Sequence, residues 1–310
     1  MQKQGRAPPK NGTHATPLAS PRTRWLDGLF PGPYTLAQKS VWLGGIMRIL
    51  VTNDDGINAP GLRAAEEIAT TIAGADGEVW VVAPSLEQSG VSHAISFVHP
   101  LRFDAIGPRR FAVEGTPADC VLAALSEIMV DTPPDLVLSG VNRGHNVAED
   151  TLYSGTIGAA MEAAMQGHRA IAMSQYFGPA NRADGVDGFT AARALGASIA
   201  ARLAADAVWA DNRYGVFYNV NFPPIADPAA AKGIRATFQG HRPGPSFRMT
   251  SEEAPNKRRY FWLSHASSNA QTEPGSDSRE CLEGWATVTP LRADLTARDV
   301  LASLETLFGG

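Results

Sequence analysis

From Met47 onward, short apolar runs alternate with stretches of helical spacing, and this alternation limits the possible folds more than any other feature. The predicted strands are 47–52, 78–83, 135–139, 169–174 and 216–222, and the predicted helices are 60–72, 118–129, 155–166 and 186–207. Strands that alternate with helices favour a parallel sheet with helices on its faces. We therefore expect an α/β protein with a mostly parallel sheet.

The two ends of the chain differ from this central part in composition and periodicity. Residues 1–46 are rich in Pro, Gly, Gln and Thr and show no periodicity, so we predict a disordered N-terminal extension. Residues 47–225 form the predicted core. Residues 226–310 carry short apolar runs between Pro and Gly residues, followed by helical spacing at 297–307. We expect a β-hairpin arm for oligomerisation and a C-terminal helix there.

The composition excludes several classes of protein. A net charge of −4 and a pI near 6.0 give no general cationic field, so polymeric nucleic acid and anionic membranes are not expected partners. No stretch reaches the roughly 18 uncharged apolar residues that a membrane span needs. Cys120 and Cys281 stand far apart and outside any CxxC pattern, which fits a reducing cytoplasm and argues against a disulfide framework.

Polar residues directly after each predicted strand are the candidates for chemistry, because parallel sheets bind ligands beyond the carboxyl ends of their strands. The first such loop is Asn53-Asp54-Asp55-Gly56. Its adjacent carboxylates repel each other, and a divalent cation relieves that repulsion. The alternative is an ordinary Asx turn with a helix cap.

The second loop runs from Pro84 to His93 and is long and polar. The hydroxyl of Ser89 or Ser92 offers an oxygen to a metal or to phosphate, and His93 is a candidate general acid. The alternative is a surface turn without a function.

The third loop follows the predicted strand at 135–139 and continues to a helix start at 154–156. Asn142 offers a neutral oxygen to a hard cation, and Arg143 offers a fixed positive charge to a phosphate. Ser154, Gly155 and Thr156 stand where free backbone N–H groups at a helix N-terminus face an anion. Ser154 as a plain helix cap is the alternative.

Other hydrolase and cofactor motifs are absent from the sequence. It has no GxSxG elbow, no HExxH zinc motif and no GxGxxG fingerprint after the first strand. The seven histidines are scattered without ligand spacing. The oxygen-rich loops favour magnesium, manganese or calcium.

In order and spacing, these loops resemble the SurE survival-protein family of metal-dependent nucleotidases. The segments that carry the resemblance are MRILVTNDDG (47–56), VVAP (81–84), QSG (88–90), GTPADC (115–120), SGVNRG (139–144), YSGT (153–156) and VTPL (288–291). They cover nearly all of the chain from Met47 onward, where family members usually begin.

The resemblance implies a Rossmann-like three-layer α/β/α core and a set of site residues. The implied metal ligands are Asp54, Asp55, Ser89 and Asn142, around one divalent ion per subunit, Mg²⁺ or Mn²⁺ with Ca²⁺ as an in vitro alternative. It also implies a homodimer or homotetramer built partly through an exchanged C-terminal arm. Two departures are Ser92-His93-Ala94, which leaves the role of His93 open, and Trp285 in place of a common tyrosine.

These observations predict an enzyme that hydrolyses nucleoside 5′-monophosphates, and by extension 3′-monophosphates, to nucleoside and phosphate. We expect Asp54 to orient or deprotonate the attacking water, with a phospho-enzyme on Asp54 as the less favoured alternative. The expected phosphate or substrate contacts are Asn53, Gly90, Arg143, Ser154, Gly155 and Thr156. The rival hypothesis is a non-catalytic nucleotide-binding regulatory protein.

Overall fold

The computed structural model describes residues 46–209, 214–244, 247–265 and 272–309. Apart from Ile46, the predicted N-terminal extension lies outside the described residues. The chain divides into two compact units, Met1–Gln38 and Lys39–Gly310, and all described residues belong to the second unit.

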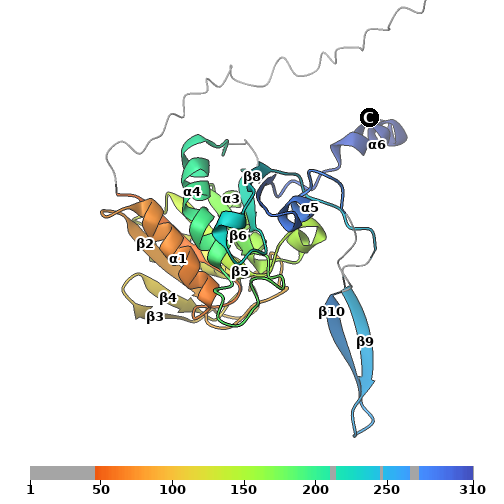
Figure 1. The fold of residues 1–310 in the computed structure, drawn as a ribbon. Coiled ribbons are helices and arrows are strands. Elements are labelled where there is room, and N and C mark those ends of the chain that lie inside the picture. The colour runs from red at the N-terminus through yellow and green to blue at the C-terminus, as the bar shows by residue number, and fades with distance from the viewer. Residues whose placement is uncertain (1–45, 210–213, 245–246, 266–271, 310) are drawn as a thin grey trace, which may run out of the picture. The chain divides into compact units, whose positions relative to one another are not determined.

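The second unit contains eleven described strands and six described α-helices (Figure 1). The strands are β1 (Arg48–Thr52), β2 (Glu78–Pro84), β3 (Phe103–Gly107), β4 (Arg110–Val113), β5 (Leu136–Arg143), β6 (Ala170–Gln175), β7 (Phe217–Phe222), β8 (Gly233–Ala236), β9 (Phe247–Glu253), β10 (Arg259–His265) and β11 (Trp285–Leu291). The helices are α1 (Pro60–Ala73), α2 (Pro117–Ala123), α3 (Gly155–Met165), α4 (Thr190–Asp206), α5 (Asp277–Leu282) and α6 (Arg298–Phe308). A π-helical turn (Ala124–Ile128) extends α2, and short 3₁₀ turns occupy Ala148–Leu152 and Pro228–Ala230.

Nine strands form one sheet in the order β3-β4-β2-β1-β5-β6-β7-β11-β8. The strands from β4 to β7 in this order are parallel, whereas β3 and β11 run antiparallel to β4 and β7. After β1 the chain goes to β2 on one side, and later to β5 on the other side. The order of the strands therefore reverses between β1 and β5, which is where sheets of this type bind ligands.

Both faces of the central strands are buried, which explains why β1 is almost wholly apolar. Ile49 and Val51 pack in the core cluster that includes α1 and α4, and Leu50 packs in the cluster that includes α2 and α3. Figure 1 shows α1 and α4 on the same side of the sheet. The predicted α/β fold with a three-layer core is confirmed. Among the described residues, no helix is long and apolar enough to cross a membrane.

The third predicted loop begins later than expected, because β5 continues through Asn142 and Arg143. The pairing of β5 with β6 shifts register between Ser139 and Asn142. A β-bulge of this kind interrupts the regular pattern and re-aims the side chains that follow it. Asn142 and Arg143 are consequently held by a strand rather than by a loop.

The residues after 225 divide between the main sheet and a separate hairpin. β8 and β11 join the nine-stranded sheet, while β9 and β10 pair antiparallel with each other in a two-stranded sheet. Trp285 begins β11, and the guanidinium of Arg235 lies 3.8 Å from its ring centroid. The tryptophan that stands here in place of a common tyrosine thus contacts a positively charged side chain of the neighbouring strand β8.

Candidate active site

The loop at the carboxyl end of β1 is closed by its own side chains and by the loop after β2. The amide of Asn53 donates to the carbonyl of Gly56 at 3.0 Å. Gly56 has φ +98°, and a Cβ there would lie 3.2 Å from the carbonyl carbon of Leu86. The backbone N–H of Gln88 donates to the carbonyl of Asp54 at 2.7 Å. Position 56 therefore requires glycine. The loop after β1 and the loop after β2 pack together as one unit.

Asp54 lies buried against the N-terminus of α3. Its two carboxylate oxygens accept from the hydroxyl of Thr156 at 2.6 Å and from the backbone N–H of Thr156 at 3.1 Å. Burial, together with the charge of Asp55, raises the pKa of Asp54 to about 6, although the hydrogen bonds from Thr156 oppose this rise. A Cβ on Gly155 would lie 2.9 Å from the Cβ of Asp54, so a side chain there would displace the carboxylate.

Asp55 faces β5, and the backbone of that strand holds its carboxylate in place. The backbone N–H of Arg143 donates to the Asp55 carboxylate at 2.9 Å. Burial raises the pKa of Asp55 and the charge of Glu87 adds to this effect, while Arg143 lowers it by hydrogen bond and charge. Glu87 is therefore an acidic residue whose charge acts on Asp55, one that the sequence analysis did not single out. The signal was its place in the second loop, two residues before Ser89.

Asn142 lies near the end of β5, and Ser89 lies in the loop after β2. The amide nitrogen of Asn142 donates to the carbonyl of Gly144 at 2.9 Å, which fixes the amide and leaves its oxygen to face the other way. Ser89 is exposed, and its hydroxyl donates to Glu87 at 2.7 Å. The next residue, Gly90, has φ +74° and open space beside its Cα. Glu87 thus links Ser89 to the surroundings of Asp55.

The helix start at 154–156 already uses some of the groups that we predicted would bind phosphate. The hydroxyl of Ser154 caps α3 by accepting from the backbone N–H of Ile157 at 3.1 Å, as the alternative reading of Ser154 proposed. Thr156 directs both its hydroxyl and its N–H at Asp54. A hydroxyl that accepts one hydrogen bond can still donate another, so Ser154 retains a proton for an anion. Thr156 instead positions a carboxylate.

His93 contacts α3 away from the carboxylate pair. Its Nε2 lies 2.6 Å from Glu162, which is buried and also accepts from Gln166 at 2.8 Å. Glu162 follows Thr156 by six residues, which is about 9 Å along a helix. The hydrogen bond from His93 lowers the pKa of Glu162, against the effect of burial. Sequence reasoning missed Glu162 because one acidic residue on an apolar helix carries no motif.

The chemistry of the donors at this site fits a hard divalent cation. Asp54 and Asp55 bring two carboxylates to one strand end. Burial and the charge of Asp55 raise the pKa of Asp54. The positive charge of a bound cation would oppose this rise. The amide oxygen of Asn142 is a neutral donor of the type that Mg²⁺ and Mn²⁺ accept. In the described part of the chain, no group of three or more His, Cys, Asp or Glu residues has the arrangement of a metal site. A site here would depend on amide, hydroxyl or water oxygens as well as carboxylates.

The strand order of the sheet reverses beside Asp54 and Asp55, and Thr156 in the first turn of α3 donates two hydrogen bonds to Asp54. This arrangement defines an α/β protein with a candidate ligand site at the carboxyl ends of its parallel strands. The family described as "Survival protein SurE" matches residues 49–244. The chain belongs to the SurE family.

Similar proteins match the chain over most of its described length. A protein from Roseobacter denitrificans named "5'-nucleotidase SurE" is 55% identical over 83% of this chain and 98% of its own length. A protein of the same name from Ruegeria pomeroyi is 54% identical over 84% of this chain and 99% of its own length. The crystal structure of the SurE protein from Aquifex aeolicus superposes with a TM-score of 0.70 at 32% identity, covering 84% of this chain and 99% of that one.

Proposed function

We propose that this chain is a 5′-nucleotidase that hydrolyses nucleoside 5′-monophosphates to nucleoside and inorganic phosphate, and that it requires a divalent metal ion. The observation that carries the proposal is the pair Asp54 and Asp55 at the strand-order reversal, with Thr156 of α3 donating twice to Asp54. Relatives at 54–55% identity that bear the name 5'-nucleotidase support the reaction class.

The residues that would hold the metal are Asp54, Asp55, Asn142 and Ser89. When bound, the ion would withdraw charge from the phosphoryl group and increase the acidity of a coordinated water. Glu87 accepts a hydrogen bond from the Ser89 hydroxyl at 2.7 Å, which directs the lone pairs of the Ser89 oxygen away from Glu87. Such a partner orients a ligand and increases its basicity.

The chain's own groups would handle the water and the phosphate. Asp54, fixed by Thr156, orients the attacking water and accepts its proton. The Ser154 hydroxyl and the exposed Arg143 guanidinium bind phosphate oxygens. Asn53 and Gly90 shape the two loops around the phosphate, and we assign His93 to anchoring the second loop on α3 rather than to proton transfer.

The test is phosphate release from AMP, GMP and a generic aryl phosphate, first with Mn²⁺ or Mg²⁺ and then with excess chelator. We expect release with metal and none with chelator. Activity that survives chelation would refute the metal requirement. Nucleotide affinity that is unchanged by chelator, without turnover, would instead favour a regulatory nucleotide-binding protein.

We further propose that the protein is a cytoplasmic homodimer or homotetramer. Exposed apolar side chains on the hairpin and on α6 support the oligomer, among them Phe261, Trp262, Leu263, Leu304 and Phe308. Two buried cysteines that are not bonded in a disulfide fit a reducing compartment.

A further inference from the structure

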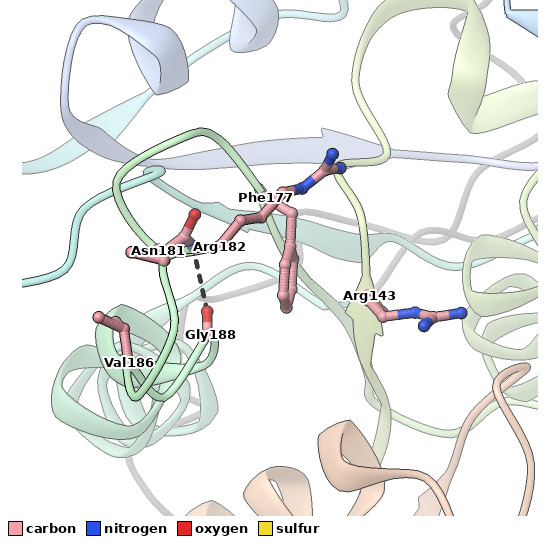
Figure 2. Close-up of a pocket in the computed structure, with 7 residues that line it drawn as sticks. Arg143, Phe177, Asn181, Arg182, Val186 and Gly188 are labelled. Carbon is pink, nitrogen blue, oxygen red and sulfur yellow. Dashed lines mark hydrogen bonds between the residues drawn. The ribbon is translucent and has the colours of Figure 1, made fainter.

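A pocket of about 500 Å³ opens between the end of β5 and the loop that joins β6 to α4 (Figure 2). It is lined by Arg143, Phe177, Asn181, Arg182, Ala183, Val186 and Gly188. The backbone N–H of Arg143 is the group that donates to Asp55. Arg143 therefore belongs to the wall of the pocket and also contacts one of the proposed catalytic carboxylates.

Buried polar contacts hold the loop that forms the far wall of the pocket. Asn181 is 1% exposed; its side-chain oxygen accepts from the N–H of Gly178, and its amide donates to the carbonyls of Tyr176 and Gly188. Phe177 packs edge to face on Phe189, with ring centroids 5.3 Å apart. A ligand would find this wall already formed, which reduces the entropy lost on binding.

The size and lining of the pocket suit a flat organic group better than a phosphate alone. Its volume lies within the range of small-molecule sites. Phe177, Ala183 and Val186 supply apolar surface, and Arg182 supplies a positive charge. Among the described residues, the Arg182 side chain has no ion-pair partner within 4.0 Å, so its donors are available. Arg143 and Arg182 both line the pocket, and in Figure 2 their side chains extend in different directions from Phe177. Because the backbone of Arg143 adjoins Asp55, we assign its guanidinium to the phosphate.

We propose that this pocket binds the base of the nucleotide and that Arg182 selects bases with carbonyl acceptors, so that GMP is preferred to AMP. This inference rests on the proposed nucleotidase function. A guanidinium is a hydrogen-bond donor only, and its fork matches the O6 and N7 acceptors of guanine. Adenine presents an amino group in place of O6, so one donor of Arg182 would lose its partner.

The first test is the ratio of kcat/KM for GMP to that for AMP, with Mn²⁺ present. We expect a ratio of about ten in the wild type, the lower part of the range for a bidentate arginine contact. Arg182→Met keeps an unbranched apolar side chain close in length to the aliphatic part of arginine and removes the guanidinium donors. It should lower kcat/KM for GMP about tenfold and change that for AMP by less than about twofold. Arg202→Met, at an exposed arginine of α4 that does not line the pocket, is the matched control.

The second test separates the base pocket from the reaction by measuring guanosine and adenosine binding calorimetrically, since nucleosides have no phosphate to release. We expect guanosine to bind about tenfold more tightly than adenosine, and we expect Arg182→Met to abolish that difference. Equal affinities in the wild type, or a difference that survives Arg182→Met, would overturn the inference. If guanosine binds as expected but no nucleotide is hydrolysed with metal, the proposed function fails and the base pocket stands.

Discussion

Thr156 holds the carboxylate on which the proposed reaction depends. Thr156→Val keeps the shape of the side chain but removes the hydroxyl that donates to Asp54 at 2.6 Å. Loss of a partner that orients a ligand typically reduces metal affinity or activity about 10–100-fold, so we expect kcat/KM to fall by that factor. Steady-state kinetics over a Mn²⁺ titration would measure it.

The matched control for this change is Thr70→Val, which removes a hydroxyl that donates to a backbone carbonyl on the exposed face of α1. The control should leave activity within about twofold of wild type and change the free energy of unfolding by less than about 0.5 kcal/mol. Equal activity in the two variants would remove Thr156 from the site.

The hydrogen bond between His93 and Glu162 makes a pH-dependent contribution to stability. This contact lowers the pKa of Glu162 in the folded protein. The ionised carboxylate therefore stabilises the fold at pH values above 4.5, the pKa of this group in the unfolded chain. That stabilisation is lost as pH falls through the folded pKa. His93→Ala should therefore reduce the free energy of unfolding at pH 7 by about 1–3 kcal/mol, with a smaller loss at pH values below the folded pKa of Glu162. Urea denaturation at several pH values would measure this difference.

The same variant separates the two roles considered for His93. If His93 anchors the loop, kcat should fall by less than about tenfold and the pH profile should keep its alkaline limb. A fall of about 10²–10⁴ together with loss of that limb would restore the general-acid role.

At the scale of elements, the second loop lies directly on α3. A Cβ on Gly158 would meet the carbonyl oxygen of Ser92 at 2.4 Å, and Ser92 also bonds to the carbonyls of Leu152 and Tyr153. An alanine in a helix is normally about 0.5–1 kcal/mol better than glycine. Here the clash with backbone should outweigh that gain, so Gly158→Ala should destabilise by about 1–3 kcal/mol and lower activity by shifting Ser89.

Gly196→Ala on α4 provides the comparison for Gly158→Ala. Its Cβ would meet the Cδ1 atom of the buried Ile68 side chain at 2.5 Å, so the clash is with a side-chain end in the core rather than with backbone. Thermal denaturation of both variants should show the larger loss for Gly158→Ala. The reverse order would mean that the loop yields more easily than the core.

The parts of this fold that sequence could predict are those with a periodic signal. β1, α1, β2, α3 and the loop at Asp54 followed from buried apolar runs with polar residues after them. β3 is an edge strand and β4 is its neighbour in the sheet; both are short and have few buried positions, so they gave no such signal. The extension of β5 through Asn142 depends on a bulge, and the direction of His93 depends on a partner 69 residues away. Sequence placed residues at strand ends, but only packing could show which way their side chains point.

At the scale of the whole molecule, α6 is an amphipathic helix with no buried residue in the described part of the chain. Val300, Leu304 and Leu307 lie on one face of it, at spacings of four and three residues. An exposed apolar face of this kind typically marks a surface that another chain covers. The proposed oligomer would bury it.

Leu304→Glu places a charge in the middle of that face and should weaken the assembly, because a buried charge without a partner is costly. Light scattering after size exclusion should show a wild-type mass of two or four chains and a lower mass for the variant. Glu305→Gln changes charge at the neighbouring position off that face, and its mass should equal that of the wild type. A wild-type monomer would contradict the proposed oligomer, and a Leu304→Glu variant of unchanged mass would show that the subunits meet without α6.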